Sequence, residues 1–194
     1  LIFKNGIKNS GEWSNGRRIG NAIIIYPDGF EVLGEYISGE FFAKIHSKCE
    51  GDCENGYGVN IWETGSKYSG QWKNGKMDGK GIYSWPDGDL YDGEFSQNLK
   101  QGYGLWIFGG DKYEGDFYND VFHGEGTYTY EYGDRHIGEW KNGLAHGQGT
   151  AITSEFTYIG GWKNDLQSGE GKIILPNGDT INGLFNEGQL IEKY

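Results

Sequence analysis

The sequence contains few of the residues and patterns that mark membrane spans, disulfide frameworks or nucleic-acid binding. Its 194 residues include three Pro, one Met and two Cys. No apolar run approaches the roughly 18 residues of a membrane-spanning helix, and two cysteines are too few for a disulfide framework. Cations are also scarce, because 17 Lys and Arg face 28 Asp and Glu and give a net charge of -11. Since an acidic surface repels phosphate backbones, we expect no nucleic-acid partner.

Glycine and aromatic residues are, in contrast, abundant. The chain has 36 Gly, seven Trp and an aromatic content of 16%. Each glycine in a helix interior costs about 1 kcal/mol relative to alanine, whereas aromatic residues favour strands. The composition therefore predicts an all-β protein.

A phrase made of an aromatic residue, a glycine, a second aromatic residue, a tight turn and a glycine pair recurs along the chain. Its clearest copy spans residues 68–81, and similar copies begin at Tyr91 and Tyr113. The first glycines of the copies are Gly11, Gly34, Gly70, Gly93, Gly115, Gly138, Gly160 and Gly183. They are 22 or 23 residues apart, except for one step of 36. A sustained period of this length is typical of stacked supersecondary units.

The period defines the expected domain organisation. We predict a single repeat array over residues 1–194, with units that start near 9, 32, 68, 91, 113, 136, 158 and 181. The long step corresponds to an inserted loop at residues 40–55. Because the chain starts within the second half of a unit, we expect it to be a fragment of a longer array or protein, or one whose first unit was trimmed.

Each unit is predicted to form an antiparallel hairpin. In the copy at residues 68–81, the first strand is expected at Lys67–Lys73 and the second at about Lys80–Trp85. Asn74-Gly75 lies between them and is a strong signal for a two-residue turn. A second turn, Pro86-Asp87-Gly88, joins this unit to the next.

The glycine spacing suggests a register for the hairpin. Gly81 lies nine residues after Trp72, and the same interval recurs in four other units. If these two residues are directly opposed, Gly70 faces Tyr83 and Tyr68 faces Trp85. Each ring then covers a glycine of the neighbouring strand, which restores packing that glycine lacks.

An acidic row accompanies the repeat glycines and is predicted to be a solvated stripe. It consists of Glu12, Glu35, Gln71, Glu94, Asp116 and Glu139. These positions recur at the repeat spacing, so cross-strand pairing and solvation explain them better than catalysis.

Other features resemble chemical sites more weakly. Glycine pairs such as Gly79-Lys80-Gly81 fit neither Gly-x-Gly-x-x-Gly nor a P-loop, and no Ser/His/Asp or Cys/His set is indicated. We therefore expect no enzyme and no cofactor. His46, Cys49 and Cys53 are spaced like three zinc ligands, whereas structural zinc sites normally have four. A local disulfide and two free thiols are the alternatives, and we expect no metal.

The units resemble the MORN repeat (membrane occupation and recognition nexus), whose pattern is Tyr-x-Gly-x-Trp-x-Asn-Gly-x-x-His-Gly-x-Gly. The stretches that begin at His123 and His146 fit its glycine pair fully, whereas Asp78, Gln101, Ser168 and Ile19 replace the histidine elsewhere. The resemblance covers the chain except for the insertion. It implies an elongated single-layer antiparallel sheet of stacked β-hairpins, a twisted half-pipe whose groove binds a partner protein. It also implies a cytoplasmic protein that is associated with the cytoskeleton, with cilia or with membranes.

We therefore expect a non-catalytic scaffold that binds a helix or an extended peptide, preferably basic, in a concave aromatic groove. The predicted partner-binding residues are Tyr68, Trp72, Tyr83, Trp85, Tyr91, Phe95, Trp106, Phe108, Tyr113, Phe117, Tyr128, Tyr130 and Trp140. If these rings only cover glycines, the row of aromatic residues has no binding role.

Two alternatives belong to other classes of function. The first is a membrane tether that binds phosphoinositides, for which Arg17, Arg18 and the lysines Lys73, Lys76 and Lys80 are the candidate residues. The second is a purely architectural subunit of a cytoskeletal or ciliary assembly, with a homodimer formed through the ends of the array.

Overall fold

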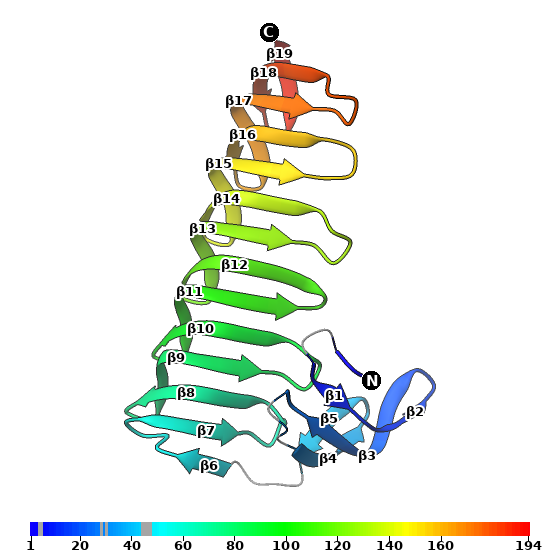
Figure 1. Ribbon diagram of the computed structural model, residues 1–194, viewed down its shortest axis with the longest axis vertical. Helices are drawn as coiled ribbons and strands as arrows, with labels where there is room; N and C mark the ends of the chain where they lie inside the picture. The colour runs from blue at the N-terminus through cyan, green and yellow to red at the C-terminus, as the bar shows by residue number, and fades with distance from the viewer. Residues whose placement is uncertain (4–5, 28, 30, 44–47) are drawn as a thin grey trace. The chain divides into compact units, whose positions relative to one another are not determined.

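The computed structural model describes residues 1–3, 6–27, 29, 31–43 and 48–194 (Figure 1). In this part of the chain every regular element is a β-strand, and the paired strands run antiparallel. The predicted all-β fold, built from successive hairpins, is confirmed.

The strands form two sheets. The first has the order β1-β3-β4-β5, with β2 paired to β3. Its strands are β1 (Lys8–Asn9), β2 (Glu12–Ser14), β3 (Arg17–Ile25), β4 (Glu31–Ile37) and β5 (Glu40–Ala43). The second sheet has 14 strands that follow the chain order from β6 to β19. Its strands are β6 (Lys48–Gly51), β7 (Tyr57–Ile61), β8 (Lys67–Lys73), β9 (Lys76–Ser84), β10 (Leu90–Ser96), β11 (Leu99–Phe108), β12 (Asp111–Tyr118), β13 (Val121–Thr129), β14 (Arg135–Lys141), β15 (Leu144–Ile152), β16 (Thr157–Lys163), β17 (Leu166–Ile174), β18 (Thr180–Asn186) and β19 (Gln189–Lys193).

The chain divides into two compact units. Unit 1 contains residues 1–99 and 106–109, and unit 2 contains residues 100–105 and 110–194. Strand β11 therefore contributes residues to both. Each unit is described by itself below.

In unit 1 the first sheet packs a core of its own. Its buried residues are Ile7, Ala22, Ile24, Tyr26, Val32, Tyr36, Phe41 and Ile61. Ile61 belongs to β7 of the second sheet, and the Ala43 amide donates to the Glu63 carbonyl at 2.7 Å. The two sheets of unit 1 are thus joined by both packing and backbone hydrogen bonds.

The departure from a continuous array lies in β5. Gly34 of β4 is paired with Ala43, where the units of the second sheet pair glycine with glycine. The Phe41 ring also fills the space above Gly34, so a Cβ at Gly34 would overlap it. β5 is the last strand of the first sheet. Residues 40–55, expected as an inserted loop, contain both β5 and β6, and residues 44–47 lie outside the described part of the chain.

The predicted hairpin turns are present in the second sheet. Asn74 and Gly75 have φ values of 52° and 68°. Positive φ at both central residues defines the type I′ turn, whose twist matches the twist of the flanking strands. Strand β8 spans Lys67–Lys73 as predicted, and β9 begins earlier than predicted, directly after the turn.

The glycine register differs from the prediction. Gly70 lies opposite Gly81, and Tyr68 lies opposite Tyr83 rather than Trp85. The same glycine–glycine pairing recurs in unit 2, as Gly115 with Gly126, Gly138 with Gly149, Gly160 with Gly171 and Gly171 with Gly183. Glycine therefore faces glycine, which brings the two backbones close together.

The turn explains why the predicted register is wrong. A two-residue turn makes Lys73 and Lys76 the first pair, and the next pair is then Trp72 with Met77. Pairing Trp72 with Gly81 would require a much longer loop than Asn74-Gly75.

The hairpins β8–β9, β12–β13, β14–β15 and β16–β17 contain a β-bulge between the turn and the two opposed glycines. In β8–β9 it falls between Gly70 and Trp72. Within the bulge, the first glycine of the Gly79-Lys80-Gly81 stretch, Gly79, has a left-handed φ of 102°. The Gln71 Oε1 atom accepts a hydrogen bond from the exposed Lys80 amide at 2.7 Å. In unit 2, Glu139 accepts the Gln148 amide and Asp116 accepts the Glu125 amide. Members of the row predicted as a solvated stripe therefore also close the bulges.

A buried tyrosine covers the glycine pair of its own hairpin. A Cβ at Gly81 would overlap the Tyr68 ring, and the Tyr68 hydroxyl donates to the Gln71 carbonyl at 2.9 Å. Tyr91, Tyr113 and Tyr158 make the same bond to the carbonyls of Glu94, Asp116 and Gly161 at 3.0 Å. Rings do cover glycines, as expected. The covering ring, however, lies on the same strand as one of the glycines, as Tyr68 lies two residues before Gly70 on β8.

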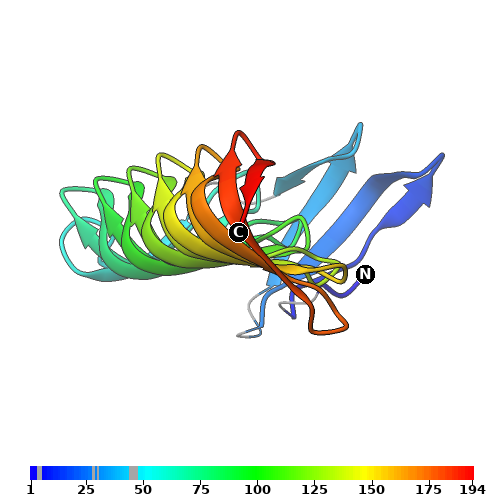
Figure 2. The same ribbon diagram turned by 90° about the horizontal axis from the view of Figure 1, so that it is seen from above.

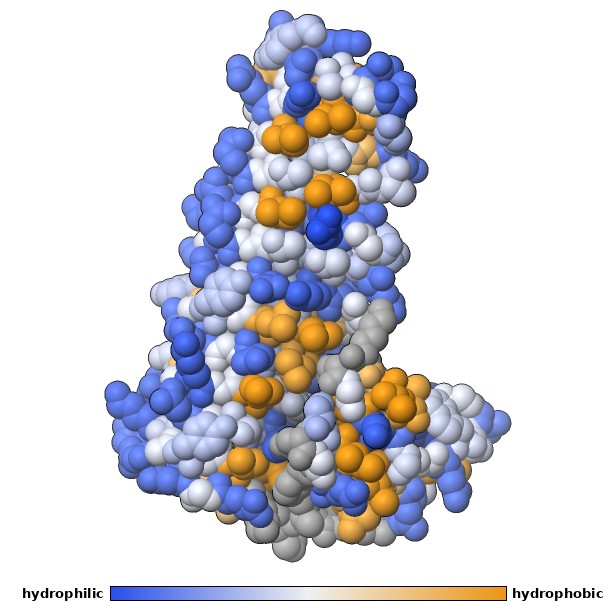
Figure 3. Space-filling view, in the orientation of Figure 1, coloured by the Kyte–Doolittle hydropathy of each residue, from blue (hydrophilic) through white to orange (hydrophobic). Residues whose placement is uncertain are grey.

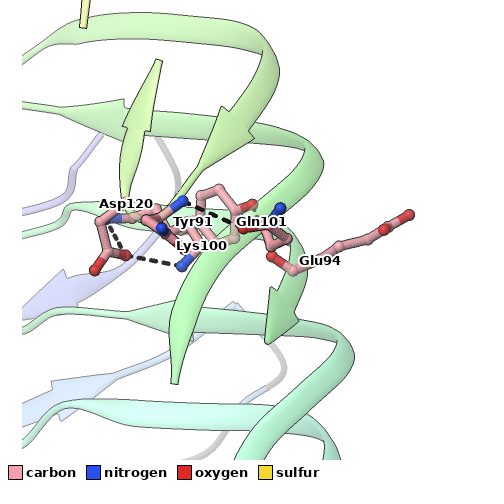
Figure 4. Close-up of polar contacts among 6 residues, drawn as sticks. Tyr91, Glu94, Lys100, Gln101 and Asp120 are labelled. Atoms are coloured by element: carbon pink, nitrogen blue, oxygen red, sulfur yellow. Dashed lines mark hydrogen bonds and ion pairs between the residues drawn. The ribbon is translucent and has the colours of Figure 1, made fainter. Parts of the chain in front are cut away.

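Turn residues also tie each hairpin to its neighbour. Where the second turn residue is not glycine, its side chain accepts a backbone amide of the preceding hairpin. These bonds join Asn98 to Met77, Asp120 to Lys100 and Asp165 to Ala145, at 2.8, 2.8 and 2.7 Å. Figure 4 shows Lys100 and Asp120, whose side chains also form an ion pair at 3.8 Å.

The strands are curved, and side-chain polarity varies along them. Figure 2 shows that the strands of unit 2 bend along their length. On the face seen in Figure 3, hydrophobic side chains gather near the middle of the strands, and hydrophilic side chains lie at their ends.

Candidate functional site

Seven of the predicted partner-binding rings are buried in the protein itself. They are Tyr68, Trp72, Tyr91, Phe95, Tyr113, Phe117 and Trp140. Tyr68, Tyr91 and Tyr113 each meet the ring four residues later, and Tyr68 and Tyr113 also meet the corresponding ring of the next hairpin. Tyr68, for example, lies edge-on to Trp72 and Phe95, with ring centroids 5.1 Å apart in both cases. These rings form the packing column of the array and leave almost no surface for a partner.

The remaining predicted rings are only partly covered. They are Tyr83, Trp85, Trp106, Phe108, Tyr128 and Tyr130. Burial raises the pKa of the Tyr83 hydroxyl, although a hydrogen bond to Ser66 opposes this shift. Four of the six belong to unit 1, and Tyr128 and Tyr130 belong to unit 2.

In unit 1 the partly covered rings form a surface that we call the unit 1 aromatic surface. It consists of Trp62, Tyr83, Trp85, Trp106 and Phe108. Trp62 stacks on Tyr83 with centroids 5.3 Å apart, and Tyr83 contacts Trp85 at 4.4 Å. Trp106 contacts Phe108 at 4.2 Å. Trp106 and Phe108 follow Gly104 at the spacing with which Tyr83 and Trp85 follow Gly81, so they occupy equivalent places in their hairpin.

A cavity of about 490 Å³ opens beside this surface in unit 1. Trp62, Trp72, Met77 and Tyr83 form its apolar wall, and Cys53 and Asn60 also line it. Its volume lies within the range of roughly 300–1,000 Å³ that is typical of ligand pockets. An apolar side chain of a partner is the kind of group that such a wall accommodates.

In unit 2 the partly covered rings form a row of tyrosines. Tyr128 contacts Tyr130 at 4.6 Å, and Tyr130 stacks on Tyr132 at 5.3 Å. The Tyr128 hydroxyl donates to Asp111 at 2.5 Å. Burial and this carboxylate raise the pKa of Tyr128, so the tyrosine remains a hydrogen-bond donor at neutral pH.

Comparison with known families decides the identity of the repeats. The family model for the MORN repeat matches residues 10–30, 68–90, 91–110, 113–135, 136–152 and 158–180, which is more than half of the chain. The chain belongs to the MORN-repeat family. No curated protein matches it.

Membership gives a general class of function. MORN repeats are non-catalytic modules that generally bind proteins or membranes, and they are associated with membrane and cytoskeletal proteins. Among the described residues, no helix is long and apolar enough to cross a membrane. The units expected near residues 32 and 181 stay predictions, because the six matched stretches do not include them.

The basic residues considered for membrane binding by this MORN protein are partly engaged. The Arg18 guanidinium donates to the Tyr36 hydroxyl at 2.8 Å and lies over the rings of Trp13 and Tyr36. The Lys76 ammonium donates to Gln97 at 2.7 Å. Lys73 and Lys80 are exposed.

The cysteines in the insertion form a disulfide. Cys49 and Cys53 are bonded, which excludes the pair of free thiols and a zinc site that uses both sulfur atoms. No group of three metal-ligating side chains occurs among the described residues. His46, the third ligand considered for zinc, lies outside them.

Sequence reasoning missed several exposed or cavity-lining rings of this MORN array. Trp62, Tyr132, Phe156 and Trp162 were absent from the predicted set, although Trp62 lies on the unit 1 aromatic surface. Tyr132 gives the clearest signal. It occupies a turn between two strands where other units carry Asp87 or Asn177, and an aromatic residue at such a place has no evident role in folding.

Proposed function

We propose that the protein is a non-catalytic scaffold that binds a segment of a partner protein on the unit 1 aromatic surface. The observation that carries the proposal is the contrast between two classes of ring. The buried tyrosines and their neighbours already cover the glycines, so the rings at Tyr83, Trp85, Trp106 and Phe108 are not needed for that task.

Part of the surface of these rings remains accessible, which supports binding. Tryptophan and tyrosine are also the residues most enriched among the energetic anchors of protein interfaces, because they bury a large area at a low entropy cost.

The charge of the protein favours a basic partner segment. With a net charge of -11, the protein attracts cationic segments and accelerates their encounter with the surface, an effect that salt weakens. The partner expected from these properties is a helix or an extended peptide with apolar anchors and basic flanks.

The test compares partner capture by three forms of the protein. Trp85→Ala combined with Trp106→Ala removes two anchors, and we expect partner affinity to fall by at least about tenfold. Tyr57→Ala is the control, because Tyr57 is an exposed ring on β7 that does not belong to the unit 1 aromatic surface. Captured proteins are quantified after pull-down from native lysate, and the affinity of each is measured with the purified forms. Equal affinity of wild type and a folded double variant rejects the proposal.

Membrane tethering and an architectural role stay predictions. Binding to phosphoinositides would use Arg17, Arg18 and the exposed lysines, and sedimentation with vesicles that contain these lipids measures it. An architectural role in a cytoskeletal or ciliary assembly, or a dimer through the array ends, is measured as molecular mass in solution with and without reductant.

A further inference from the structure

Unit 2 contains a second aromatic cavity, distinct from the surface used in the proposed function. Its volume is about 440 Å³. Tyr130, Tyr132, Phe156 and Trp162 form its aromatic wall, and Asp134 and Asp165 line it as well. The cavity therefore combines ring faces with two carboxylates.

One ring at this cavity is exposed without a structural reason. Tyr132 is 76% exposed, although it stacks on Tyr130, which is 38% exposed. Turn tips normally carry small polar residues. The Tyr130–Tyr132 pair thus offers two adjacent aromatic rings to any group that enters the cavity.

The charges around these rings are mainly negative. Burial raises the pKa of Tyr130, and the neighbouring Tyr132, Asp165, Asp111 and Asp134 raise it further. Three carboxylates therefore lie within electrostatic reach of one hydroxyl. Arg135 is the one permanently charged cation among the lining residues, and it is exposed.

The carboxylates keep acceptor capacity for a ligand. The Oδ1 atom of Asp165 accepts the Ala145 amide at 2.7 Å, which fixes the position of the carboxylate. An ionised carboxylate accepts several hydrogen bonds, so this one bond leaves the second oxygen available. Asp165 is exposed and Asp134 is half-buried, so both are open to a group that arrives from solvent.

We propose that this cavity receives the arginine side chain of a partner polypeptide. A guanidinium stacks on the faces of aromatic rings and donates in pairs to carboxylates, whereas a lysine ammonium acts as a single hydrated charge. A cation over aromatic rings gains about 0.5–1 kcal/mol at exposed sites and more where water is excluded. Anionic ligands are disfavoured by the surrounding aspartates. The inference goes beyond the proposed function and shares with it only the class of partner, a polypeptide.

The experiment uses three tripeptides and the full chain. They are acetyl-Gly-Arg-Gly-amide, its Lys counterpart and its Met counterpart, titrated at millimolar concentration. Binding is followed through the Trp162 indole N–H signal by NMR. We expect the Arg peptide to bind more tightly than the Lys peptide and the Met peptide to bind least. Equal binding of the Arg and Met peptides, or no change at Trp162 with any of them, overturns the proposal.

Charge-matched variants test the role of the aspartates. Asp134→Asn with Asp165→Asn keeps the shape of both side chains and preserves the acceptor for the Ala145 amide. We expect this pair to weaken the Arg peptide by about five- to tenfold. Glu125→Gln with Glu170→Gln changes the net charge equally at exposed sites on the opposite face of the strands, and it is expected to alter binding by less than about twofold. An equal effect of the two pairs contradicts a local site.

Failure of the arginine site can be distinguished from failure of the proposed function. If the Arg peptide fails while partner capture still depends on Trp85 and Trp106, only the cavity assignment is lost. If the Arg peptide binds while the double variant captures partners normally, the unit 1 aromatic surface is rejected and the cavity stands.

Discussion

The two glycines of each Gly-x-Gly stretch, such as Gly79 and Gly81 on β9, have different physical roles. Gly79, Gly124 and Gly147 have left-handed φ values of 102°, 57° and 61°, which the bulge requires. The second glycines, such as Gly81 and Gly126, have ordinary extended backbones but lie directly beneath a tyrosine ring. Substitution of the first kind strains the backbone, and substitution of the second kind displaces a ring.

The second glycines should differ in their tolerance of a methyl group. A Cβ at Gly126 would overlap Tyr113, whereas a Cβ at Gly149 would lie 3.0 Å from the His136 and Trp162 rings. We expect Gly126→Ala to destabilise the protein by about 1–3 kcal/mol and Gly149→Ala to cost less. Urea unfolding of the two variants provides the measurement. If both variants lose the same free energy of unfolding, overlap with the tyrosine ring is not the cause of the destabilisation.

His136 is the exception in the packing column. It occupies the place that Tyr68, Tyr91, Tyr113 and Tyr158 hold in other hairpins. Its ring lies edge-on to Trp140 and Trp162, with centroids 5.0 and 4.5 Å apart. It is 6% exposed, and its Nε2 atom has no hydrogen-bond partner among the described residues.

Acid should destabilise the protein through His136. Burial lowers the pKa of His136 below its ordinary value of 6.5, and Asp165 only partly opposes this. Its other close neighbours are Tyr128 on β13 and the uncharged Ala151 on β15. Because the unfolded chain binds the proton more readily, stability falls as the pH drops below 6.5 and levels off below the folded pKa.

Thermal melts between pH 7.5 and 5.5 measure this effect. His136→Tyr restores the usual residue of the column, with no group that titrates in this range. We expect a smaller loss of Tm on acidification in the variant than in the wild-type protein. Identical pH profiles indicate that His136 contributes nothing to the acid response.

At the scale of the hairpin, the side chain of the turn residue joins neighbouring elements. Asp120 has a left-handed φ of 68°, which glycine adopts with less strain. Its carboxylate nevertheless accepts the Lys100 amide and faces the Lys100 ammonium, whose pKa is lowered by burial and raised by Asp120. The hydrogen bond compensates for the less favourable turn residue.

Asp120→Gly separates these two contributions. The variant keeps the turn but loses the acceptor, and we expect stability to fall by about 1 kcal/mol. Hydrogen exchange should accelerate most at the Lys100 amide. Asp120→Asn keeps the acceptor and removes only a partly exposed ion pair, so protection of that amide should persist. Faster exchange in both variants would show that the charge, and not the hydrogen bond, matters.

Sequence patterns predict hairpins better than they predict register. Asn74-Gly75 identified the turn and the end of β8, because the type I′ conformation strongly selects this dipeptide. The bulge next to Gly70 has no comparably clear signal, since it depends on the pairing of two strands. The same limit applies to the site. Ring spacing located the aromatic strip, but it did not separate the buried Tyr68 from the half-buried Tyr83.

At the scale of the whole molecule, the first sheet shows where repetition fails. The sequence period continues through Gly11 and Gly34, so a continuous array was expected. The structure places this region in a separate sheet, in which Ala43 instead of a glycine lies opposite Gly34. Regular spacing of the first glycines is therefore not enough to predict a continuous sheet.

The disulfide should stabilise unit 1 locally. It joins Cys49 on β6 to Cys53, four residues later, at the free edge of the second sheet. A loop this short gives about 2 kcal/mol in the chain-entropy description. We expect Cys49→Ser with Cys53→Ser to accelerate hydrogen exchange in β6 and β7 and to leave β15–β17 unchanged.

Reductant provides the control for this prediction. It should reproduce the effect in the wild-type protein and have no further effect on the double variant. Uniform loss of protection across both units contradicts a local role.

The exception at His136 also has a genetic consequence. A tyrosine codon and a histidine codon differ by one base, so a single point mutation in one copy of a duplicated gene segment converts one into the other. The remaining copies continue to encode the ring that the sheet requires. A tandem array can thus acquire an ionisable side chain in its interior by a change of a single base.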